Sequence, residues 1–205
     1  VTGGKERIKY FISSLSLSSS RELECLADVI PLHETKTKLY VHSVTSGELQ
    51  LRSGVKRLIL EAREENIRLG IATTTSIENV EVLIKSTLGE KALGWFDVVV
   101  AGDMVTSKKP AADVYEEIVR RFNLPPNECI AFEDSRNGLL SATLAGVPCV
   151  VTPCQWTSNQ NFSESCLVLP ELGDPDQPLK DFISLGLAQP WLTVEDLRKA
   201  DRYAA

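Results

Sequence analysis

The sequence predicts an α/β fold with a parallel sheet, and two features of the chain support this fold class. Past about residue 50, short apolar runs alternate with amphipathic segments of helical length. Strands separated by such helices imply right-handed β-α-β crossovers, and therefore parallel strands. The composition also suits a globular protein with a core, since 43% of the 205 residues are apolar and 24% are charged.

Residues 1–47 are predicted to be helical. Helices are expected over 6–12, 21–29 and 32–44. In the first of them, Ile8, Phe11 and Ile12 have the spacing of an amphipathic helix. The second should end near Pro31, because proline disrupts the preceding helical turn.

After residue 50, predicted helices and strands alternate. The strands are expected over 67–73, 96–101, 129–132 and 147–152, with a short last strand at 167–169. The helices are expected over 55–66, 77–88, 110–122, 137–145, 179–185 and 194–203. Pro110 should open its helix, since proline already has helical φ. Thr193 and Asp196 have the spacing of a capping box.

Charge and composition exclude several function classes. The net charge is −6 and there is no run rich in lysine and arginine, which argues against a nucleic-acid partner. No stretch approaches 18 uninterrupted apolar residues, so no membrane span is expected. The five cysteines form an odd set without a Cys-x-x-Cys pair, so we expect a reducing compartment and no structural disulfide.

Hydroxyl side chains gather where the strand at 67–73 ends. Thr74 and Thr75 lie there, just before a helix whose N-terminal N–H groups and dipole favour a phosphate. The alternative is a plain helix N-cap, which needs only one such hydroxyl. Asn79, one turn into the helix, is a candidate substrate contact.

Charged side chains follow the next two strands. Lys109 stands before Pro110, and Glu133 and Asp134 are adjacent at the end of the strand at 129–132. The two carboxylates repel each other, so Mg²⁺ would account for their placement. The alternatives are a solvated lysine and a helix N-cap at 134–135. Because ligands bind outside the carboxyl ends of parallel strands, these groups should meet at one site for phosphate and a divalent cation.

Together these motifs resemble the second, third and fourth motifs of the haloacid dehalogenase (HAD) superfamily. Their order and spacing look like the CbbY-like branch, which comprises sugar-phosphate phosphatases with a helical cap and includes plastid forms. The resemblance extends over nearly the whole chain. It is carried by Gly102-Asp-x-Val-x-x-x-Lys-Pro-Ala111, Glu133-Asp-Ser-x-x-Gly-Leu139, Ala145-Gly-Val-Pro148 and Gln155-Trp-Thr-x-x-Gln160.

The resemblance implies an HAD-like Rossmannoid core over 50–205 and a partial helical cap over 1–49. It also implies a two-step phosphoryl transfer, in which an aspartate attacks phosphorus and water hydrolyses the aspartyl phosphate. Thr74 would bind the phosphoryl oxygens, and Lys109 would offset their charge and orient the nucleophile. Asp134 would bind Mg²⁺, supported by Glu133 directly or through water.

The resemblance also implies contacts with the rest of the substrate. Lys5 and Lys36 lie in segments that look like the phosphate-contacting parts of the family's cap. Arg52 stands where the family often has Arg-Pro-Gly, although Ser53 replaces the proline here. The predicted substrate-binding set is Lys5, Lys36, Arg52, Thr75 and Asn79.

One family motif is absent. Asp-x-Asp-Gly, which follows an apolar strand in the family and supplies nucleophile and acid/base, does not occur in residues 1–205. The segment 173–176 has the Asp-x-Asp spacing but lies in a proline-rich loop with no strand before it, so we reject it. We expect a truncated sequence that lacks the first strand of the core, shows no turnover and is poorly stable alone.

The expected function of the intact parent is a Mg²⁺-dependent phosphatase of a phosphorylated sugar, with a sugar bisphosphate as one option. Two alternatives remain open: a noncatalytic protein that binds a phosphorylated metabolite or a partner, and a phosphomutase of the same fold. The resemblance places the protein in the chloroplast stroma, and a monomer is expected for the intact parent.

Overall fold

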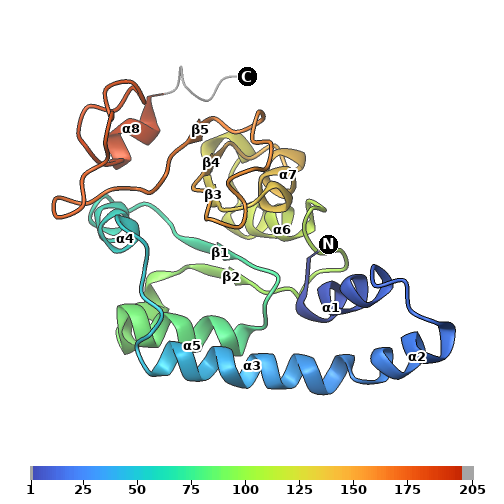
Figure 1. The fold of residues 1–205 in the computed structure, drawn as a ribbon. Helices are drawn as coiled ribbons and strands as arrows, with labels where there is room; N and C mark the ends of the chain where they lie inside the picture. The colour runs from blue at the N-terminus through green and yellow to red at the C-terminus, as the bar shows by residue number, and fades with distance from the viewer. Residues whose placement is uncertain (1, 200–205) are drawn as a thin grey trace.

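The computed structural model describes residues 2–199 (Figure 1). Its α-helices are α1 (Gly4–Ser13), α2 (Ser19–Ala27), α3 (Val29–Thr45), α4 (Val55–Glu64), α5 (Ile77–Leu88), α6 (Asp113–Phe122), α7 (Arg136–Leu144) and α8 (Val194–Arg198). Short 3₁₀ turns are η1 (Glu90–Trp95) and η2 (Pro126–Glu128). The strands are β1 (Gly70–Ala72), β2 (Val98–Val100), β3 (Ala131–Glu133), β4 (Cys149–Val151) and β5 (Leu167–Val168).

The predicted parallel pairing is confirmed, but the strands form two separate sheets. In the first sheet β1 pairs with β2, with Ala72 opposite Val100. In the second sheet the order is β3-β4-β5, with Glu133 opposite Val151. All pairs are parallel, as the helix-strand alternation requires.

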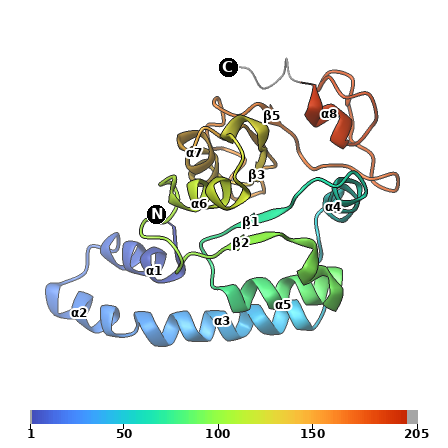
Figure 2. The ribbon, with the colours of Figure 1, turned by 180° about the vertical axis from the view of Figure 1, so that it is seen from behind.

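The strands β1 and β3 face the gap between the two sheets. Both views place β1, rather than β2, on the side of its sheet that faces β3 (Figures 1 and 2). Among residues 2–199, each of these strands has a strand neighbour on one side only. Phe132 in β3 is 39% exposed, and Gly70 in β1 is exposed as well. The inner edges of the two sheets are therefore open.

Helix α6 holds the two sheets to one core. Its apolar stripe of Val114, Tyr115, Ile118 and Phe122 is buried. This stripe shares one cluster with residues of both sheets, and the cluster continues into α7. An amphipathic helix with a wide apolar stripe is stabilised by such burial rather than by its own propensity.

The helices α1–α3 pack on one another, and α3 packs on α5. Helix α3 lies along α5 in both views (Figures 1 and 2), and Val29 and Val44 are its buried residues. In α1 only Ile12 is buried, whereas Phe11, expected on the same apolar face, is 61% exposed. The boundary expected at residue 49 stays a prediction.

Several predicted elements differ in the structure. Pro31 does not end a helix; it lies in the first turn of α3, where its missing N–H would have no partner in any case. Pro110 lies three residues before α6, after a cis peptide bond. The segment 179–185 forms turns instead of a helix, with Asp181 at φ +55°. Helix α8 ends at Arg198, and the rest of the span predicted to 203 continues beyond the described residues.

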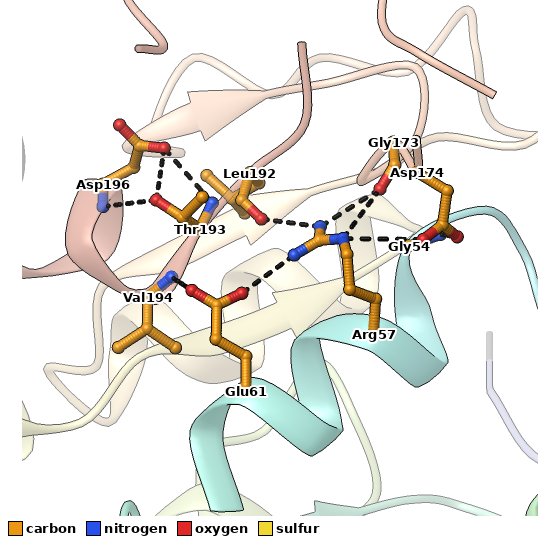
Figure 3. A network of polar contacts seen from close by, with 9 residues as sticks. All are labelled: Gly54, Arg57, Glu61, Gly173, Asp174, Leu192, Thr193, Val194 and Asp196. Atoms are coloured by element: carbon orange, nitrogen blue, oxygen red, sulfur yellow. Dashed lines mark hydrogen bonds and ion pairs between the residues drawn. The ribbon is translucent and has the colours of Figure 1, made fainter. Parts of the chain in front are cut away.

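The C-terminal segment is fastened to α4 by a polar network (Figure 3). The Arg57 guanidinium donates to the carbonyls of Gly173 and Leu192, the latter at 2.7 Å. It also pairs with Glu61 and Asp174. Nearby, the predicted capping box of Thr193 is confirmed. The side chain of Arg57 is 19% exposed, so these contacts are partly shielded from water.

We expect Arg57→Ala to lower the free energy of unfolding by about 2 kcal/mol, because two carboxylates and two carbonyls lose their donor. Urea unfolding followed by circular dichroism measures the change. Arg21→Ala is the control, since Arg21 pairs with Glu24 while 66% exposed and should stay close to wild type. Equal losses in both variants would contradict the role given to the network.

Candidate functional site

The ammonium group of Lys109 joins the carboxyl ends of β1 and β3. Its Nζ donates to the carbonyl oxygen of Ala72 at 3.0 Å and to Oε1 of Glu133 in a short contact. The side chains of Lys109 and Glu133 are 11% and 8% exposed. The predicted meeting of the lysine with the acidic pair is thus present in the geometry, on the Glu133 side.

Tyr115, to which no sequence motif pointed, supports the same carboxylate. Its hydroxyl donates to Oε1 of Glu133, and its ring centroid lies 5.2 Å from Nζ of Lys109. Burial and the neighbouring Glu133 charge raise the pKa of Tyr115 well above its usual value, so the phenol stays protonated and donates. Its place on the buried stripe of α6 was the signal available in the sequence.

Helix α7 approaches Glu133 closely at Gly138. A Cβ atom on Gly138 would overlap the Glu133 carboxylate, chiefly at Oε2. Ser135 is the N-cap of this helix, and its side chain accepts from the N–H of Gly138 at 3.4 Å. The absence of a side chain at Gly138 therefore permits this close approach, and the atoms that it meets are those of Glu133.

The threonine loop after β1 is held by the loop after β2. The N–H of Thr75 donates to Oγ1 of Thr73, and the N–H of Gly102 donates to the carbonyl of Thr75. A Cβ on Gly102 would overlap the backbone of Thr74, so only glycine allows this approach. Asn79 donates to Oγ1 of Thr75 at 3.0 Å. Within residues 2–199 no hydrogen bond engages the Thr74 hydroxyl.

Asp134 presents its carboxylate to solvent. It is exposed, and among the described residues no hydrogen bond or ion pair engages that carboxylate. Its backbone is anchored instead, because the Thr157 hydroxyl donates to its carbonyl at 2.6 Å. Gln160 accepts from the N–H of Arg136 at the start of α7. The segment from Gln155 to Gln160 is therefore hydrogen-bonded to the end of β3 and to the start of α7.

Residues 2–199 contain no group of three or more His, Cys, Asp or Glu side chains that could hold a metal ion. Of the two predicted carboxylate ligands, Asp134 is free to bind and Glu133 already accepts from Lys109 and Tyr115. The repulsion between the adjacent carboxylates is thus relieved on the Glu133 side by a lysine. The direct metal contact of Glu133 stays a prediction.

The start of α1 is attached to the loop that carries Lys109. The Thr2 hydroxyl donates to the Lys109 carbonyl in a short contact, and Nζ of Lys108 pairs with Glu6 at 2.7 Å. This ion pair and its hydrogen bond lower the pKa of Glu6. The two adjacent lysines therefore point to different partners: Lys108 binds α1, and Lys109 binds the ends of β1 and β3.

The candidate cap lysines lie close to the contact between α1 and α3. The ring of His33 packs against Gly4, where a Cβ atom would lie 2.5 Å from it. Lys5 follows Gly4, and Lys36 lies three residues after His33, on the same side of α3. Both lysines are exposed. Their substrate contact stays a prediction.

Arg52 is occupied by backbone carbonyls. Its guanidinium donates to the carbonyls of Thr152 at 2.6 Å, Pro153 at 3.1 Å and Pro170 at 2.6 Å. These contacts tie the start of α4 to the loops that follow β4 and β5. Arg52 therefore has a structural role, and its predicted contact with substrate stays a prediction.

Comparisons of this chain with known proteins agree on one family. A family model described as haloacid dehalogenase-like hydrolase matches residues 4–152. The CbbY protein of a Cupriavidus necator plasmid is 38% identical over 198 residues, covering 97% of this chain and 78% of that protein. A CBBY-like protein of Arabidopsis thaliana is 28% identical and is covered over 59% of its length.

Solved structures agree with the sequence relatives. The crystal structure of CbbY from Rhodobacter sphaeroides in complex with phosphate is similar with a TM-score of 0.72 and 40% identity. The match covers 83% of this chain and 74% of that one. A mutant of the same protein, solved in complex with xylulose-(1,5)-bisphosphate, also has a TM-score of 0.72.

Within residues 2–199, no helix is both long and apolar enough to cross a bilayer.

We expect Gly138→Ala to destabilise the protein by about 1–3 kcal/mol, because the added methyl must displace a carboxylate held by two donors. Thermal unfolding measures the loss. Gly94→Ala is the matched control, since a Cβ there has nothing within 4 Å. An unchanged melting temperature in Gly138→Ala would show that Glu133 can move freely.

Proposed function

This chain belongs to the haloacid dehalogenase-like hydrolases, and on that premise we propose that it carries the phosphate-binding part of a sugar-phosphate phosphatase site. The observation that carries the proposal is the Lys109 ammonium, fixed between the ends of β1 and β3 at 3.0 Å from the Ala72 carbonyl. Thr74 lies two residues after Ala72, and within residues 2–199 no hydrogen bond engages its hydroxyl. The phosphate complex of the Rhodobacter sphaeroides relative supports the same ligand class.

Two side chains would bind the transferring phosphoryl group. An ammonium has three N–H donors, and Lys109 uses two of them on Ala72 and Glu133, which leaves one for a phosphate oxygen. The hydroxyl of Thr74 would donate to a second oxygen. Fixed donors of this kind in a partly dehydrated site stabilise the charge of the transition state without reorganisation.

Mg²⁺ is part of the proposal, and the carboxylates present fit a half-site for it. Mg²⁺ in phosphoryl-transfer sites is commonly held by one or two carboxylates together with phosphate oxygens and water. Asp134 would be the direct protein ligand, because its carboxylate is exposed and free of other partners within residues 2–199. Glu133 would support the site through water. When bound, the ion would neutralise charge on the phosphate.

The nucleophile would come from a further strand between β1 and β3. These strands have open inner edges, and the Asp-x-Asp-Gly motif of the family is absent from residues 1–205. A parallel strand seated there would join the two sheets and bring its carboxyl end beside Lys109 and Asp134. Without it, the residues described can bind and orient a phosphate but offer no group to attack phosphorus.

Substrate and setting are inferred from the relatives. The complex of the Rhodobacter sphaeroides protein with a sugar bisphosphate favours a bisphosphate here. Lys5 and Lys36 would bind the second phosphate, because the start of α1 is attached to the Lys109 loop. The plastid setting rests on the sequence resemblance, and a relative from a plant, Arabidopsis thaliana, is compatible with it. A phosphomutase and a noncatalytic phosphometabolite-binding protein are the other candidates that the same site would serve.

The proposal is tested by turnover of a sugar bisphosphate with Mg²⁺, in residues 1–205 alone and in a longer protein that adds a strand with Asp-x-Asp-Gly. We expect no turnover above background from the shorter chain and clear turnover from the longer one. Lys109→Ala in the longer protein should lower kcat roughly 10²-fold or more, since one fixed cation is lost.

Lys108→Ala is the matched control for that variant. It removes the same charge one residue away, where the partner is Glu6, so its effect on kcat should be much smaller. A larger loss of kcat in Lys108→Ala than in Lys109→Ala would show that Lys108, not Lys109, is the cation that binds the phosphate. Turnover by residues 1–205 alone would show that the nucleophile lies within them.

A second prediction concerns the cap. Lys5→Ala and Lys36→Ala should each raise KM for a sugar bisphosphate and leave KM for a small phosphate monoester almost unchanged, because only the bisphosphate has a second phosphate to bind. Steady-state kinetics with both substrates measure the difference. Equal losses on the two substrates would instead indicate a disturbed fold of α1–α3.

A further inference from the structure

The buried hydroxyl of Tyr115 is the least expected polar group near the candidate site. Tyr115 stands in the first turn of α6 and is 7% exposed, among the apolar residues of the core. A buried phenol normally finds a hydrogen-bond partner, and here the partner is the Glu133 carboxylate. The sequence offered no reason for a tyrosine rather than a phenylalanine at this position.

Oε1 of Glu133 accepts from both Tyr115 and Lys109. The other oxygen, Oε2, lies so close to Gly138 that a methyl group would overlap it. The carboxylate is thus confined from α6 on one side and from α7 on the other. The ammonium of Lys109 is bound to this carboxylate and to the Ala72 carbonyl.

We propose that Tyr115 is a positioning residue, which fixes the Glu133 carboxylate and through it the ammonium of Lys109. The ring contributes by lying under Nζ, 5.2 Å away, but a phenylalanine would supply that contact too. What the hydroxyl adds is a second donor on Oε1. Without it, the carboxylate has one donor and can rotate, and Lys109 then follows it away from the end of β1.

This inference rests on the proposed function for its purpose, but it is measurable without turnover. A lysine ammonium held by fixed acceptors exchanges its protons with water slowly, and a mobile one exchanges quickly. In ¹⁵N-labelled residues 1–205, the Lys109 ammonium signal is assigned by its loss in Lys109→Met. Its exchange rate then reports whether the group is held.

In Tyr115→Phe we expect this exchange to become about tenfold faster or more, the effect of losing one charge-assisted hydrogen bond. Tyr10→Phe removes a hydroxyl from an exposed tyrosine of α1 and should leave the rate unchanged. Ile118→Val shortens a buried side chain on the same face of α6 and controls for general loosening. An exchange rate in Tyr115→Phe within twofold of wild type would overturn the proposal, as would equal acceleration in Ile118→Val.

Inorganic phosphate separates this inference from the proposed function. If phosphate shifts the Lys109 signal in the wild-type chain, the ammonium lies at a phosphate site, as proposed. If millimolar phosphate leaves the signal in place while Tyr115→Phe still accelerates exchange, Lys109 does not bind phosphate. The positioning role of Tyr115 is then supported on its own.

Discussion

The structure depends on one buried ion pair, between Lys109 and Glu133, because it is a polar link across the gap between the two sheets. Both side chains are almost fully buried, and each has additional hydrogen-bond partners. Desolvation of such a pair is costly, and its attraction offsets that cost only when the remaining donors and acceptors are also satisfied. Here the Ala72 carbonyl and the Tyr115 hydroxyl complete the set. Helices α6 and α7 both contact this pair, α6 through the Tyr115 hydroxyl and α7 through the close approach of Gly138.

Alternation of apolar runs and helices was enough to predict parallel strands and most helices. This pattern gave wrong predictions where the same residue type is compatible with two local structures. Proline stops a helix from the inside but is accepted in a first turn, so Pro31 could not be placed by its type alone. The segment 179–185 has enough apolar residues for a helix, but Asp181 adopts left-handed φ and Leu179 donates to the Pro190 carbonyl. Such long-range contacts are invisible in a local pattern.

The candidate site was predictable where the chain itself places groups at strand ends. Glu133 ends β3, and Thr74, Lys109 and Asp134 come after strands. The structure brings Lys109 and Glu133 together. The roles within the site were less predictable. A carboxylate pair suggests a nearby cation, which can be a metal ion or a lysine. Here Glu133 binds Lys109, which lies 24 residues earlier in the sequence, so the pair of carboxylates alone does not identify the cation. Tyr115 was missed because its position on the helix face is equally that of a core residue.

The attachments of α1 and of Arg52 restrict how the helical segment can move against the sheets. At one end, Thr2 and Glu6 bind the loop of Lys108 and Lys109. At the other, Arg52 binds carbonyls that follow β4 and β5, and the N–H of Gly54 binds Asp174 at 2.6 Å. The six residues between α3 and Arg52 are mostly exposed. Together with the packing of α3 on α5, these contacts hold α1–α3 from both ends, so the helices that carry Lys5 and Lys36 keep one orientation towards the loop of Lys109.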